Sequence, residues 1–90
     1  MKKEVRKELD DLIKIIRNWK DCEVRISDCD GTDQFVLDDY IEDITRVLMP
    51  YVSRLRECAH VTHEEFIDFI SQVREEVDDM RRQLQLPEPE

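Results

Sequence analysis

The residues best suited to chemistry lie in one acidic stretch that begins at Asp28, with the sequence DCDGTDQFVLDD. Carboxylate and hydroxyl oxygens two residues apart are typical of a calcium-binding loop. On that interpretation the calcium ligands are Asp28, Asp30, Thr32 and Asp39. The stretch departs from an EF-hand loop, because its sixth position is Asp33 instead of Gly and its twelfth is Asp39 instead of a bidentate Glu. Calcium binding is therefore an alternative and not the main expectation.

A second candidate metal set contains the soft ligands of the chain: Cys22, Cys29, Cys58, His60 and His63. Thiolates and imidazoles suit zinc, but these spacings match no zinc-finger or zinc-ribbon pattern. We expect instead that Cys58 ends an apolar helix face and that both histidines lie in a turn. An odd number of cysteines indicates reduced thiols and not a disulfide framework.

The segment DCDGT at 28–32 resembles the first motif of haloacid-dehalogenase-type phosphatases, in which the first Asp is a nucleophile and the second a general acid. The resemblance covers only these five residues, and that family needs a parallel α/β sheet for which this chain has no room. The single glycine also excludes a glycine-rich phosphate loop. We therefore expect no catalytic residues, no cofactor and no enzymatic activity.

The negative charge of the chain is concentrated between residues 28 and 43. The formal net charge is −9, yet outside this window fourteen bases oppose sixteen acids. The window contains no Lys or Arg and seven acids, which are Asp28, Asp30, Asp33, Asp38, Asp39, Glu42 and Asp43. Two explanations are open: the acids form a surface that attracts a basic partner, or they separately form turns and complement the positive end of a helix.

We favour the first explanation, and predict a small regulator or inhibitor that docks these seven acids on a basic surface of a protein target, including a surface that normally holds nucleic acid. Direct binding to nucleic acid or to anionic membranes is not expected of so acidic a chain. No segment has the pattern of a signal peptide or a membrane span, so we expect a cytoplasmic protein. The alternatives are an assembly protein that forms a homodimer, with Ile15, Met49 and Ile67 at the margins of its apolar faces, and a divalent-metal-binding module.

Three apolar repeats must position these residues. Apolar side chains recur every three or four residues over about 2–20, 38–58 and 63–85, which predicts three amphipathic helices. Pro50 predicts a kink in the second helix, and Thr62 with Glu65 forms a capping-box signature before the third. The expected fold is a mainly α, three-helix antiparallel bundle in a single domain spanning 1–86.

The segment 22–37 predicts a β-hairpin between the first two helices. Its apolar residues alternate on both sides of Asp30-Gly31, a dipeptide typical of two-residue hairpin turns. With that turn, Ile26 faces Phe35, Val24 faces Leu37, and all four point toward the helices. Residues 87–90 are expected to be a flexible tail.

Overall fold

The computed structural model describes residues 3–87, which form helices and connecting loops without any strand. The elements are α1 (Lys3–Ile26), α2 (Gln34–Asp43), a π-helical turn η1 (Ile44–Leu48), α3 (Met49–Glu57) and α4 (His63–Gln83). Because α2, η1 and α3 follow each other without interruption, they act as one long helix. The greater part of the predicted tail, 88–90, lies outside the described residues.

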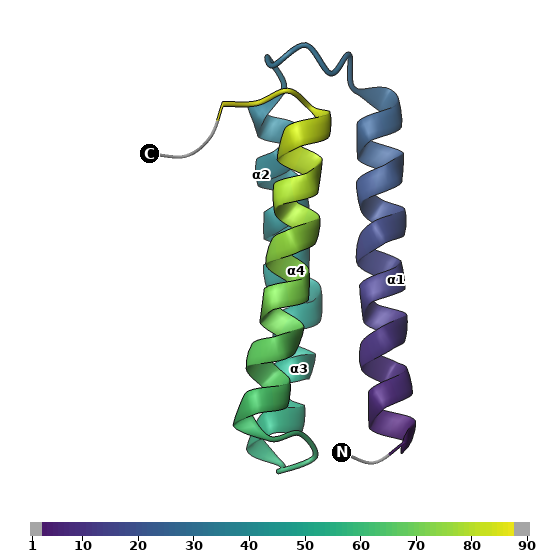
Figure 1. The fold of residues 1–90 in the computed structure, drawn as a ribbon, viewed down its shortest axis with the longest axis vertical. Helices are drawn as coiled ribbons and strands as arrows, with labels where there is room; N and C mark the ends of the chain where they lie inside the picture. Colours follow the sequence, from purple (N-terminus) through teal and green to yellow (C-terminus); the bar gives the residue numbers. More distant parts are fainter. Residues whose placement is uncertain (1–2, 88–90) are drawn as a thin grey trace.

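The three long helices lie side by side in a rod of 42 × 26 × 18 Å (Figure 1). Helices α1 and α4 run in the same direction, and the continuous helix α2-η1-α3 runs against both. The loop 27–33 lies at one end of the rod, next to the end of α4, while the turn between α3 and α4 lies at the other. The predicted mainly α bundle is therefore present.

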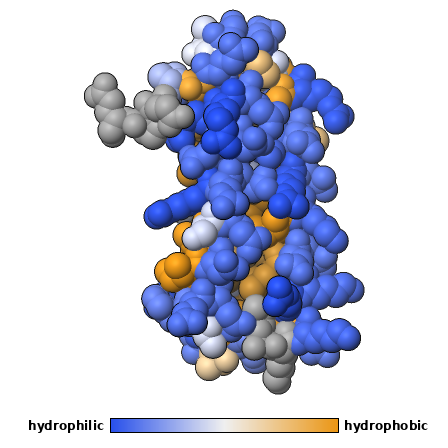
Figure 2. Space-filling view, in the orientation of Figure 1, coloured by the Kyte–Doolittle hydropathy of each residue, from blue (hydrophilic) through white to orange (hydrophobic). Residues whose placement is uncertain are grey.

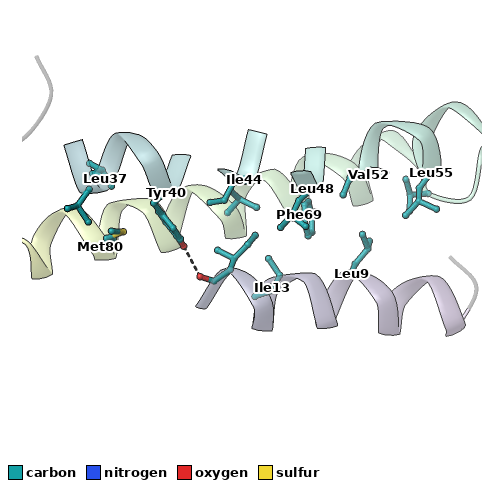
Figure 3. Packing of buried hydrophobic residues seen from close by; sticks show 14 of the residues in the cluster. Leu9, Ile13, Leu37, Tyr40, Ile44, Leu48, Val52, Leu55, Phe69 and Met80 are labelled. Atoms are coloured by element: carbon teal, nitrogen blue, oxygen red, sulfur yellow. Dashed lines mark hydrogen bonds between the residues drawn. The ribbon is translucent and has the colours of Figure 1, made fainter. Parts of the chain in front are cut away.

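The core runs the length of the bundle and receives side chains from all three long helices (Figure 3). Leu9, Ile13 and Ile16 of α1 contribute one side of it. The phenol of Tyr40 is fully buried, and its hydroxyl donates a hydrogen bond of 3.1 Å to the backbone carbonyl of Ile16. Burial is the main reason that the pKa of Tyr40 is raised above its usual value.

The predicted β-hairpin is wrong, because both of its strands are helical. Residues 22–26 continue α1, residues 27–33 form a loop, and α2 begins at Gln34. Of the four residues expected to face the helices, Leu37 is buried and Val24 half-buried, whereas Ile26 and Phe35 are exposed. The alternation covers only about four residues on each side of the turn, which is too short to outweigh the continuation of a helix with a buried face.

The π-helical turn η1 directly precedes Pro50. A proline in a helix has no N–H to donate, and its ring collides with the carbonyl four residues earlier. Here the N–H of Met49 bonds to the carbonyl of Ile44, five residues back, and the Thr45 hydroxyl donates to the carbonyl of Ile41 at 2.9 Å. The distortion predicted at Pro50 therefore takes the form of a widened turn, and the helix continues through it.

The start of α4 confirms the predicted capping box. The backbone N–H of Glu65 donates to the Thr62 hydroxyl at 3.1 Å, and the N–H of Thr62 donates to the Glu65 carboxylate at 2.9 Å. The cap satisfies two backbone donors that the helix itself leaves without partners. It fixes α4 one short turn after α3.

Candidate functional site

The loop 27–33 carries the first acids of the window and is held by its own side chains. The Ser27 hydroxyl donates to Asp33 at 2.6 Å, and Asp30 accepts from both the backbone N–H and the hydroxyl of Thr32, at 3.1 and 2.6 Å. These hydrogen bonds from Thr32 stabilise the charged form and lower the pKa of Asp30. Asp28 and Asp30 are exposed, while Asp33 is half-buried.

Gly31 fastens this loop to the far end of the chain. Its N–H donates to the carbonyl of Leu84 at 3.0 Å, and its φ is +85°, a conformation that glycine adopts without strain. A Cβ at this position would lie 2.8 Å from the carbonyl oxygen of Gln85. The glycine therefore permits a close backbone approach, and it fixes the acidic loop against the end of α4, where Leu84 and Leu86 are buried.

The remaining acids lie on α2, but not where a helix-dipole explanation needs them. Since α2 begins at Gln34, its first turn contains no acid, and the favourable effect of the helix N-terminus falls off beyond that turn. Glu42 and Asp43 lie near Arg46, at 3.6 and 3.5 Å. These two acids are therefore partly neutralised by a base that lies just outside the window.

Of the seven acids in the window, four are exposed and have no cationic partner within residues 3–87: Asp28, Asp30, Asp38 and Asp39. Within the described part of the chain, Asp38 accepts one hydrogen bond, of 3.1 Å from the Gln34 side chain. Two large apolar side chains lie at the same end of the molecule, Ile26 at 78% and Phe35 at 65% exposure. We call these six residues the acidic end. The sequence did not predict that Ile26 and Phe35 are exposed, because the hairpin prediction pointed both side chains toward the helices.

Neither metal set is brought together. Among residues 3–87, no three His, Cys, Asp or Glu side chains lie close enough to share a metal ion. The four calcium candidates are divided between the loop and the second turn of α2, where Asp39 lies. Of the zinc candidates, Cys22 and Cys29 lie near one end of the rod, and Cys58, His60 and His63 lie at the other. The geometry therefore gives no support to either metal alternative.

A polar network joins α1 to α4, and the apolar pattern of the sequence did not reveal it. The ammonium of Lys20 donates to Glu76 at 2.6 Å and to Asp79 at 2.7 Å, and Arg17 donates to Glu76 at 2.7 Å. Lys20 is only 7% exposed. Its burial alone would lower its pKa, but the two carboxylates together raise it. Burial acts to raise the pKa of Glu76, yet the hydrogen bonds from Lys20 and Arg17 prevail and lower it.

An apolar groove lies between α2-η1-α3 and α4, with a volume of about 410 Å³. Its floor is made by Ile41, Ile44, Met49, Val73 and Val77. Apolar surface is visible in Figure 2 along the left edge of the molecule, on the side of α4 away from α1. The sequence places Met49 at the margin of an apolar helix face. Only the fold shows which residues share the groove with it.

The other two marginal residues, Ile15 and Ile67, are 39% and 47% exposed. Dimerisation through them stays a prediction, which concentration-dependent melting would test. No helix within residues 3–87 is long and apolar enough to cross a membrane.

Comparison of the chain with protein-family models, with curated proteins and with solved structures found no match.

Proposed function

We propose that the protein is a non-enzymatic binding protein whose acidic end docks on a basic surface of a target protein, and thereby regulates or inhibits that target. The observation that carries the proposal is the combination of four exposed carboxylates, unpaired with any cation in residues 3–87, with two exposed apolar side chains at the same end. Carboxylates speed the encounter with a basic surface, and desolvated apolar anchors prolong the complex.

The placement of Asp38 and Asp39 supports a role outside the fold. They lie beyond the first turn of α2, so the helix dipole does not account for them. Like charges held close together oppose folding by mutual repulsion. A binding surface explains why the chain keeps them together.

The decisive experiment uses two variants with the same change of charge. One carries Asp30→Asn, Asp38→Asn and Asp39→Asn in the acidic end. The matched control carries Glu4→Gln, Glu57→Gln and Glu75→Gln, three exposed acids on other parts of the bundle.

Proteins retained from a lysate of the source cells are identified first, and the binding kinetics of each purified candidate are then measured. At low salt the acidic-end variant should associate about tenfold more slowly than the wild type, because electrostatic steering is lost, and the control should change little. High salt should abolish the difference. Equal association rates for the two variants would refute the proposal.

The role of the apolar pair is measured separately in the same complex. Phe35→Ala should leave the association rate unchanged and raise the dissociation rate, because an apolar anchor acts mainly after the encounter. An unchanged dissociation rate would exclude Phe35 as an anchor.

A further inference from the structure

We propose that the groove between α2-η1-α3 and α4 binds a single amphipathic helix of a partner protein, which carries acidic residues on the flank that faces α4. The proposal does not rest on the function proposed for the acidic end, because it concerns another surface and other residues.

The groove is long enough along the helix to accept about two turns of a docked helix. From Ile41 to Met49, eight residues along a helix span about 12 Å, or two turns. On the opposite wall, Arg74, Val77 and Arg81 recur at spacings of three and four, which places them on one face of α4. An apolar floor between two antiparallel helices accepts the i, i+3 and i+7 side chains of a third helix laid along it.

The charges at the rim specify the occupant. Arg74 is exposed and has no ion-pair partner within residues 3–87, although the chain as a whole is strongly acidic. Arg81 also lines the groove and is bound to Asp78 at 2.9 Å. A helix with carboxylates on the flank toward α4 complements the charge of Arg74, which is unpaired within residues 3–87.

A second copy of this chain does not fit the groove as well. The wide apolar faces of its three long helices are buried in its own core, and the exposed apolar side chains that a folded copy keeps are divided between different helices, such as Ile15 on α1 and Ile67 on α4. Two grooves placed face to face would leave a void between them, because both are concave. A separate helix, supplied by another protein, remains the occupant that fills the groove.

The probe for the test is a displayed library of 14-residue helices with Leu fixed at i, i+3 and i+7 and with Ala, Gln, Glu or Lys at all other positions. It is selected on the wild-type protein and depleted on two groove variants. Val77→Asp places a charge on the floor, and Thr45→Trp fills the groove from an exposed position without altering the charge. Circular dichroism tests whether each variant is folded. If the Val77→Asp variant does not fold, the Thr45→Trp variant alone is used for the depletion.

Selected helices should bind the wild type at least ten times more tightly than either folded groove variant, with Glu enriched on one flank. Arg74→Glu should weaken these helices about fivefold, and a selection on that variant should enrich Lys on the same flank. A pool without any preference for the wild type over the groove variants would overturn the proposal. So would a flank composition that is the same on the wild type and on Arg74→Glu, or a homodimer that Val77→Asp dissociates.

Discussion

At the scale of single residues, the buried lysine of α1 is the least expected feature of the bundle. A charged group leaves water at a cost of several kcal/mol unless it is paired and hydrogen-bonded. Lys20 meets this condition with two carboxylates from α4, and Glu76 in turn binds Arg17. The four residues therefore hold α1 and α4 in one register, which an apolar seam alone would specify less strictly.

Lys20→Met should lower the free energy of unfolding by about 2 kcal/mol, because Glu76 would keep only Arg17 in a half-buried position. The loss is smaller than for a fully buried pair, since the Asp79 side chain is 40% exposed. Urea unfolding measures the change. The double variant Lys20→Met, Glu76→Leu should recover most of the stability, and a double variant as unstable as the single one would show that the ion pair is not the cause.

The same network gives a pH dependence with a defined sign. Folding lowers the pKa values of Glu76 and Asp79 from 4.5 and 3.8, so their contribution is complete above that range and is lost as the pH falls through the folded values. Folding raises the pKa of Lys20 from 10.5, so its contribution is complete below that value and is lost as the pH rises through the folded one. The stability attributable to the network therefore has its plateau between these limits.

At the scale of elements, the lysine also explains why the sequence prediction failed at the end of α1. The buried stripe of that helix continues from Ile16 through Lys20 to Val24 at spacings of four. A lysine at a core position interrupts the apolar pattern, so the sequence alone does not show that the helix continues, and the alternation on both sides of Asp30-Gly31 predicts a strand there instead. The salt bridges that make Lys20 a core residue come from α4, more than fifty residues away, and local patterns do not contain them.

The continuous helix α2-η1-α3 also has a feature that the sequence alone does not predict. Its core positions include Tyr40, Ile44, Leu48 and Val52, three consecutive spacings of four. In a regular α-helix each such spacing rotates the side chain by about 40°, so the stripe would drift around the helix by about 120°. The π turn corrects this drift. Pro50 predicts a distortion of the helix from the sequence alone. The sequence does not predict that this distortion keeps Val52 in the core and leaves Tyr51 exposed.

The capping box, in contrast, depends only on residues three positions apart, so the sequence predicts it directly. Thr62→Ala should destabilise the protein by about 1 kcal/mol, because the N–H of Glu65 loses its acceptor. Thr62→Ser keeps the hydroxyl and should cost much less. Thermal unfolding of the two variants tests the difference, and equal melting temperatures would mean that the cap contributes nothing to α4.

At the scale of the whole molecule, the net charge of −9 is distributed unevenly along a rod 42 Å long. Most of the excess negative charge comes from residues 28–43, in the half of the rod that contains the loop 27–33. Several acids of α1 and α4 are paired with bases, as Glu76 is with Lys20 and Arg17 and Asp78 is with Arg81, whereas the unpaired acids of these helices are spread along them. The exposed acids of the acidic end have no paired base within residues 3–87. The molecule is therefore polar along its length, and a basic surface would orient it before contact.

If binding and not folding accounts for these acids, the chain must be more stable without them. The variant with Asp28→Asn, Asp38→Asn and Asp39→Asn should unfold at a higher urea concentration than the wild type in low salt, because mutual repulsion is removed. The difference should shrink as salt screens the charges, since the Debye length falls from about 30 Å at 0.01 M to 10 Å at 0.1 M.

Neutralising Glu4, Glu57 and Glu75 changes the net charge by the same amount and should have a smaller effect, because these acids are not clustered. A less stable variant would mean that the carboxylates support the loop or α2, in which case their presence needs no partner to explain it.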